Sequence, residues 1–232
     1  MKFNLKTLVA AVALAAVAGQ ASAALSLPTA TTSSDVIFFA MDQATGNMFS
    51  FDLGATSVLS SLNQNITGDA WTSYLTAENN SLANTTWGIA YDFNGGSNSL
   101  WGTTVTSGSA IGSETTAKMA AGNAAFNNFL KGTALTAAGT SAFTNAGNAA
   151  NFTFGLKDNW GGNAAGWTND NAVGTIANFY TVTATTSGAG GTLLGSYSFD
   201  GATVAAVPEP ETYSMLFAGL MMLGAIARRR KI

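Results

Sequence analysis

The sequence predicts a mainly β fold, an antiparallel β-sandwich with helical insertions, between residues 24 and 206. Short runs rich in β-branched and aromatic residues recur along this part of the chain, several with period-two alternation. Segments rich in Gly, Asn and Ser separate these runs, as turns do in all-β domains. Two stretches of helical periodicity interrupt the strands and leave an α+β fold as the alternative.

Two β-hairpins are expected in the first half of this body. Residues 35–54 contain two apolar runs joined by the turn-rich loop 42–47, and the second run places its large apolar residues on one face. Residues 86–106 contain a second pair of strands around the Asn-Gly-Gly-Ser-Asn turn at 94–98.

Two segments read as helices. In residues 69–78, Trp71, Tyr74 and Leu75 recur at i, i+3 and i+4, which places them on one helical face. Residues 113–131 repeat the same spacing with Met and Phe. An Ala-, Gly- and Thr-rich stretch with few core-forming residues follows.

Strand patterns resume after this stretch, at residues 151–157, 175–185 and 192–207. No repeat of fixed period occurs along the chain. The pattern leaves the order in which the strands pair open.

The first 23 residues have the organisation of a secretory signal peptide. Two lysines precede an apolar run at residues 8–18, and the small residues Ala21 and Ala23 precede the expected cleavage site. Ala24 is then the first residue of the mature chain. The alternative, an N-terminal membrane anchor, requires a longer apolar run. We therefore expect export through Sec-type machinery.

The charge of the predicted body excludes one class of partner. Residues 24–206 carry ten Asp and Glu side chains against three Lys, a formal charge of −7, whereas the whole chain has −3. A body without a basic patch has nothing to neutralise phosphates, so we expect no nucleic-acid binding. The basic residues are concentrated in the two terminal segments.

The chain contains neither Cys nor His. Catalytic Ser-His-Asp and Cys-His arrangements and ordinary zinc sites are therefore excluded, and we expect no enzyme activity, no metal and no cofactor. A carboxylate pair of the glycosidase kind remains open, but no spacing selects one. Asp52, Asp92 and Asp200 follow aromatic residues near strand ends and are expected to serve in caps or turns.

The densest polar and aromatic stretch lies between residues 157 and 174. Indole rings stack on sugar rings, and Asp and Asn side chains bond their hydroxyls, so this stretch is a candidate glycan-binding loop. The alternative is a long connection that its tryptophans anchor on the core. The candidate residues are Trp160, Trp167, Asp158, Asn169 and Asp170.

Three segments of different composition follow one another in residues 207–232. Pro208, Glu209 and Pro210 form an extended and accessible motif, because proline lacks a backbone donor and restricts the residue before it. Residues 213–227 are apolar and predict a short transmembrane helix. The basic end that follows predicts a stop with the body outside the cytoplasm. It consists of Arg228, Arg229, Arg230 and Lys231.

This order of motif, apolar helix and basic end resembles the PEP-CTERM sorting signal of Gram-negative bacteria. The resemblance covers about 25 of the 232 residues and implies recognition by an exosortase, an integral-membrane cysteine enzyme that cleaves near the motif. The hairpin at residues 34–54 is also similar to the start of some exported proteins with this tail, without an implied activity. A plain C-terminal membrane anchor is the alternative for the tail.

The sequence therefore predicts an exported, non-enzymatic protein that is transiently anchored in the inner membrane. It would then reach the cell surface or the extracellular space as a structural or interaction component of exopolysaccharide or biofilm. A carbohydrate-binding module or adhesin is the first alternative. A carboxylate-dependent polysaccharide hydrolase is the second.

Overall fold

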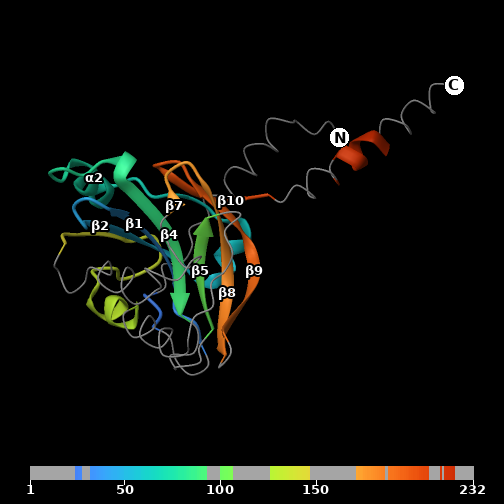
Figure 1. Ribbon diagram of the computed structural model, residues 1–232, viewed down its shortest axis with the longest axis horizontal. Coiled ribbons are helices and arrows are strands. Elements are labelled where there is room, and N and C mark those ends of the chain that lie inside the picture. The colour runs from blue at the N-terminus through green and yellow to red at the C-terminus, as the bar shows by residue number, and fades with distance from the viewer. Residues whose placement is uncertain are drawn as a thin grey trace, which may run out of the picture.

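The computed structural model describes residues 24–27, 32–92, 100–106, 126–146, 171–185, 188–208, 215 and 217–222. Within these residues the chain is mainly antiparallel β with few helices, which confirms the predicted fold class at that level (Figure 1). The strands form one 10-stranded sheet in the order β3-β10-β9-β8-β5-β4-β1-β2-β6, and β7 pairs with β4 beside this path.

The described elements follow one another along the chain in this order. The strands are β1 (Val36–Asp42), β2 (Met48–Gly54), β3 (Asn63–Asn65), β4 (Thr85–Asp92), β5 (Leu100–Thr106), β6 (Ser141–Thr144), β7 (Asn171–Ala172), β8 (Ile176–Thr185), β9 (Gly188–Phe199) and β10 (Thr203–Val207). The helical segments are η1 (Thr56–Ser61), α2 (Asp69–Thr76), η2 (Leu82–Asn84) and residues 126–132.

Both predicted hairpins are confirmed, because β1 pairs with β2 and β4 pairs with β5. The single strand run expected at 192–207 is a third hairpin, β9 and β10. Its turn contains Gly201 with φ of +100°, a conformation that favours glycine. The strand expected at 151–157 and the first part of the helix expected at 113–131 lie outside the described residues. The strands β3, β6 and β7 and the short helical segments η1 and η2 were not predicted.

The sheet bends on itself around an aromatic core. The rings of Phe38 on β1 and Phe199 on β9 have centroids 4.8 Å apart, although β4, β5 and β8 lie between their strands. Neighbouring strands are about 4.8 Å apart, so a flat sheet would separate the two residues by roughly 19 Å. The two halves of the sheet therefore face each other across the core.

Helix α2 covers one side of this core. Trp71 stacks on Tyr74 at 5.0 Å and meets the edge of Phe49 at 4.9 Å and of Phe199 at 5.7 Å. Leu75, expected on the same face, is 38% exposed. The helix has eight residues, and its two aromatic rings fill the arc that faces the sheet. Leu75, which follows Tyr74, therefore lies at the edge of the buried face of the helix and remains partly exposed.

The other face of β1, β2 and β4 is also buried. Ile37 and Phe39 alternate with the core residues of β1 and have almost no exposed surface. Residues 126–135 contribute buried Phe and Leu side chains, and the Asn127 amide donates to Asp92 Oδ2 at 2.9 Å. This part of the sheet is thus packed on both faces, although its second face also carries carboxylates.

Asp42 organises the first hairpin from a fully buried position. Its Oδ1 accepts the backbone N–H groups of Ala44 and Thr45, each at 2.9 Å, and its Oδ2 accepts that of Ser81 at 2.8 Å. Burial by itself raises the pKa of Asp42, but these donors and the Thr45 hydroxyl outweigh burial and hold the pKa below its usual value.

We expect Asp42→Ala to lower the free energy of unfolding by about 2–3 kcal/mol, because three backbone donors lose a charged acceptor. Urea unfolding of both proteins measures this difference. Asp42→Asn keeps one oxygen acceptor and should lose less. Equal unfolding midpoints for Asp42→Ala and the unchanged protein would contradict a stabilising role for this turn.

Candidate functional site

Most residues singled out in the sequence for a function lie outside the described residues. They are Trp160, Trp167, Asp158, Asn169, Asp170, Glu209, Pro210, Arg228, Arg229, Arg230, Lys231, Ala21 and Ala23. The structure describes Ala24 and Pro208, the residues at which the two predicted processing segments join the body.

Pro208 lies directly after the last paired residue of the sheet. Val207 is opposite Ser196 on β9, and the Ala206 N–H donates to Leu62 O at 2.7 Å on the other side of β10. Backbone donors alternate sides along a strand, so the nitrogen of Pro208 faces the same side as that of Ala206. A proline at this position leaves no donor unpaired there, which explains how the strand can end beside η1.

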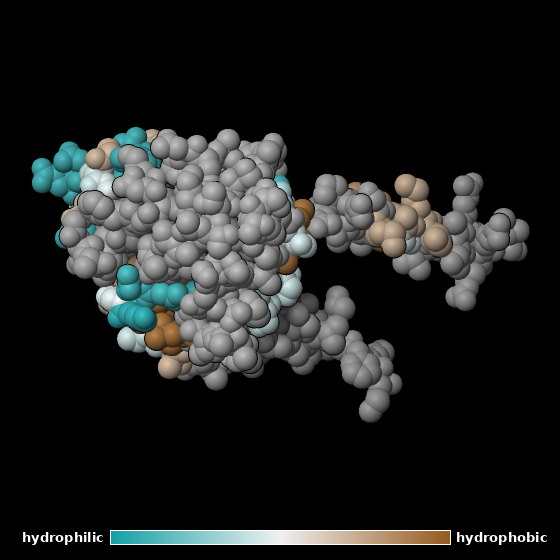
Figure 2. Space-filling view, turned by 60° about the horizontal axis from the view of Figure 1, so that its bottom comes forward, coloured by the Kyte–Doolittle hydropathy of each residue, from teal (hydrophilic) through white to brown (hydrophobic). Residues whose placement is uncertain are grey.

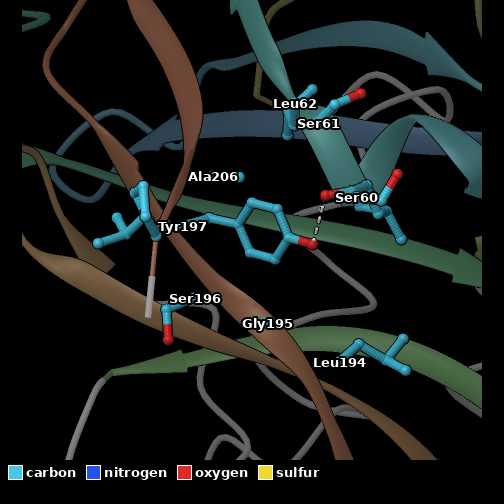
Figure 3. Close-up of a pocket in the computed structure, with 11 residues that line it drawn as sticks. Ser60, Ser61, Leu62, Leu194, Gly195, Ser196, Tyr197 and Ala206 are labelled. Carbon is cyan, nitrogen blue, oxygen red and sulfur yellow. Dashed lines mark hydrogen bonds between the residues drawn. The ribbon is translucent and has the colours of Figure 1, made fainter. Parts of the chain in front are cut away.

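A groove of about 450 Å³ opens at this end of the sheet, between η1, β9 and the end of β10 (Figure 3). Figure 3 shows the Tyr197 ring lying across it, with its hydroxyl directed toward the segment that carries Ser60 and Ser61. The lining residues are Leu59, Ser60, Ser61, Leu62, Leu194, Gly195, Ser196, Tyr197, Ala206, Val207 and Pro208.

The groove is apolar and hydroxyl-lined, and none of its lining residues carries a charged side chain. The Tyr197 hydroxyl donates to Leu59 O at 2.9 Å, and burial, together with Tyr91, raises the pKa of Tyr197 to about 12. The hydroxyl of Ser196 donates to Asn178 Oδ1 at 2.8 Å. None of these hydroxyls is a general base or an activated nucleophile. Because the groove also carries no charged side chain, it is suited to contact a neutral surface.

Two consecutive leucines of β9 are exposed, and one of them lines the groove. Leu194 lines it, and both Leu193 and Leu194 are nearly half exposed, at 47% and 45%. The register of β8 against β9 shifts between Phe179 and Tyr180, which leaves Leu194 without an opposite residue on β8. This β-bulge turns the strand locally and explains why two consecutive leucines reach the surface.

A pair of buried carboxylates lies where β1 begins and β2 ends. Asp52 has no exposed surface; its Oδ1 accepts the Gly54 N–H at 2.7 Å, and its Oδ2 has no hydrogen-bond partner among the described residues. Asp35 is 6% exposed, and its Oδ2 accepts the Ser26 N–H at 2.7 Å.

Burial raises the pKa of Asp52 to about 6, although the Gly54 donor opposes the rise, and the nearby Asp35 charge adds to it. Burial also raises the pKa of Asp35. A glycosidase requires two carboxyl groups with different pKa values, but a polysaccharide must also be able to reach them. Asp52 has no surface at which a sugar could make contact. Within the described residues, no group of three metal-ligating side chains could hold a metal ion.

The other two aspartates singled out in the sequence have structural roles. Asp200 Oδ1 accepts the N–H groups of Ala202 at 2.9 Å and Thr203 at 2.7 Å, which confirms its predicted place in a turn. Asp92 is fully buried at the end of β4, and its N–H donates to the Ser34 hydroxyl at 2.9 Å.

The first residues after the predicted signal peptide are attached to the body. Ala24 forms an isolated β-bridge with Ala137, and the Leu25 N–H donates to Thr136 O at 2.9 Å. The contact of Ser26 with Asp35 is reciprocal, since the Asp35 N–H donates to Ser26 O at 3.2 Å.

The C-terminal tail is described only in part. Residues 217–222 are helical, and Figure 2 shows them, coloured as hydrophobic, apart from the body. Phe217 is 61% exposed and Met221 74%. Among the described residues, no helix has the length and apolar character needed to cross a bilayer. Compared with protein-family models, curated proteins and solved structures, the chain has no match.

Two features of the site were missed at the sequence level. The groove joins three segments that are far apart in the chain, and no local pattern marks it. The burial of Asp52 was also missed, but the sequence contains a pattern that indicates it. Ser50 and Asp52 alternate with Phe49, Phe51 and Leu53, and the consecutive phenylalanines of β1 indicate that both faces of the neighbouring strand are buried.

Proposed function

We propose that the protein is an exported component of the cell surface or extracellular matrix. An exosortase-like enzyme sorts it at Pro208-Glu209-Pro210 after the tail has held it transiently in the inner membrane. One observation carries this proposal: the last paired residue of the sheet is Val207, directly before the motif. The last fully buried core residue is Val204, so the described body depends on no residue beyond the motif.

This boundary has a physical consequence for processing. Among the described residues, a cut within or after the motif removes no strand, no core side chain and no hydrogen bond of the sheet. The released body would keep its fold. The predicted mature chain would begin at Ala24, the first residue that the structure describes, which pairs with Ala137 of the body.

We further propose that the body acts as a structural or interaction module in exopolysaccharide. Its formal charge of −7 keeps it soluble and repels acidic polymers unless cations bridge them. Contact with neutral glycans through Trp160 and Trp167 stays a prediction, and we assign no catalytic role to the described carboxylates.

Mass spectrometry of the exported material tests the sorting proposal. We expect the mature chain to end near residue 210 and to lack the basic end, whereas replacement of residues 208–210 by alanines should leave the tail intact. An intact basic end on both exported proteins would contradict sorting at this motif. Alanine replacement of Thr72 and Thr76, exposed residues of α2 outside the groove, provides a control for general effects of substitution.

A further inference from the structure

The acidic body has an uncharged surface at the point where the tail leaves it. The groove beside Pro208 is lined by apolar and hydroxyl side chains, and Leu193 and Leu194 add exposed apolar area at its rim. We call this surface, made of the groove residues and Leu193, the exit surface. Two consecutive exposed leucines beside an apolar groove form a continuous apolar area at the surface.

The length of the connection limits where this surface can lie. Five residue steps separate Pro208 from Tyr213, the first residue of the predicted membrane segment. A fully extended chain covers at most about 3.4 Å per residue, so these steps reach no further than about 17 Å. In the anchored protein Pro208, at one end of the exit surface, is therefore within about 17 Å of the start of the apolar segment, no more than two to three times the roughly 5–8 Å depth of one headgroup region.

The chemistry of the exit surface matches the boundary between lipid headgroups and acyl chains. Leucine side chains enter this boundary, and the hydroxyls of Ser60, Ser61 and Ser196 can exchange hydrogen bonds with headgroups and water. The rest of the body carries the acidic residues, which an anionic bilayer repels. An orientation that places the exit surface on the membrane therefore buries apolar area without bringing a charged side chain of the groove to the bilayer.

We propose that the exit surface docks on the lipid bilayer while the protein is anchored. This inference rests on the anchoring that is part of the proposed function, and it adds a defined orientation of the body. Docking holds Pro208 at the level of the membrane surface. The sorting motif is then presented where a membrane-embedded enzyme can bind it, and cleavage frees the body because two leucines alone do not retain it.

The absence of cysteine makes a direct test possible. The full chain is placed in vesicles of phosphatidylethanolamine and phosphatidylglycerol that contain brominated lipid, with a fluorophore on Ser61→Cys, an exposed groove position. A fluorophore on Leu75→Cys, on α2, is the control, since that residue is 38% exposed and α2 packs against β2 and β6 and lines no part of the groove. We expect at least threefold stronger quenching at position 61. Equal quenching at both positions would overturn the proposal.

A second pair of variants separates docking from mere closeness to the tail. Leu193→Ser with Leu194→Ser should reduce quenching at position 61 at least threefold, whereas Leu75→Ser with Leu82→Ser, at similarly exposed leucines, should not. Unchanged quenching in the first variant would overturn docking through these leucines. Flotation of the vesicles reports anchoring separately. A chain that floats without quenching at position 61 contradicts docking alone, and a chain that does not float contradicts the anchoring as well.

Discussion

Phe199→Ala is expected to lower the free energy of unfolding by about 3–5 kcal/mol. The Phe199 side chain has no exposed surface, and its ring meets those of Phe38 at 4.8 Å, Trp71 at 5.7 Å and Trp87 at 6.2 Å. These partners come from the opposite half of the sheet and from α2. The substitution therefore leaves a cavity where the two halves of the bent sheet meet, and it removes edge-to-face contacts that add to the loss of buried area.

Chemical denaturation of the full chain measures this effect. Phe217→Ala is a matched control, because it makes the same change at a residue that is 61% exposed in the tail. We expect its unfolding midpoint to equal that of the unchanged protein. A loss below about 1 kcal/mol for Phe199→Ala would show that the two halves of the sheet are held together by other contacts.

Asp52→Asn is expected to stabilise the protein at neutral pH by about 2–3 kcal/mol. The pKa of Asp52 rises from 3.8 to about 6 on folding, mainly because burial disfavours the charged carboxylate. The folded state thus binds the proton more tightly than the unfolded state. The contribution of the protonated form is complete below pH 3.8 and is lost as the pH rises through 6, and a shift of this size corresponds to about 3 kcal/mol.

Thermal unfolding between pH 4 and pH 8 tests this sign. The unchanged protein should lose stability as the pH rises from 4 to 7, and Asp52→Asn should lose much less. Asp200→Asn is the control with the opposite sign, because backbone donors from Thr203 and Ala202 lower the pKa of Asp200 and stabilise its charged form. A destabilised Asp52→Asn at pH 7, with an unchanged profile, would mean that the buried carboxylate is needed in its charged form.

The strands could be predicted because local pattern and tertiary environment agree. In β2, alternation sends Phe49, Phe51 and Leu53 into the core, as the sequence indicates. The strand β6 could not be predicted, because Phe143 is its only large apolar residue. It is a strand because it pairs with β2. A weak local pattern gives no information about such a partner.

The bend of the sheet and the groove could not be predicted for a related reason. Both depend on contacts between segments that no local signal connects, such as the bond from the Tyr197 hydroxyl to Leu59 O across 138 residues. The sorting motif, in contrast, is a local pattern and is read from the sequence directly. The predicted role of the motif is therefore better defined than that of the body. For the body, the sequence indicated most strands but not the exit surface.

The pairing of β3 with β10 also determines when the protein can fold. The strand β3 pairs with residues 203–205 of β10, so the sheet cannot be completed until nearly the whole body is available. Contacts of such large sequence separation give slow folding, because a long loop must be closed before the contact is gained. The proposed export would benefit from this delay, because a chain that crosses a membrane must stay extended, and the last strand would enter the sheet when only the tail remains to follow.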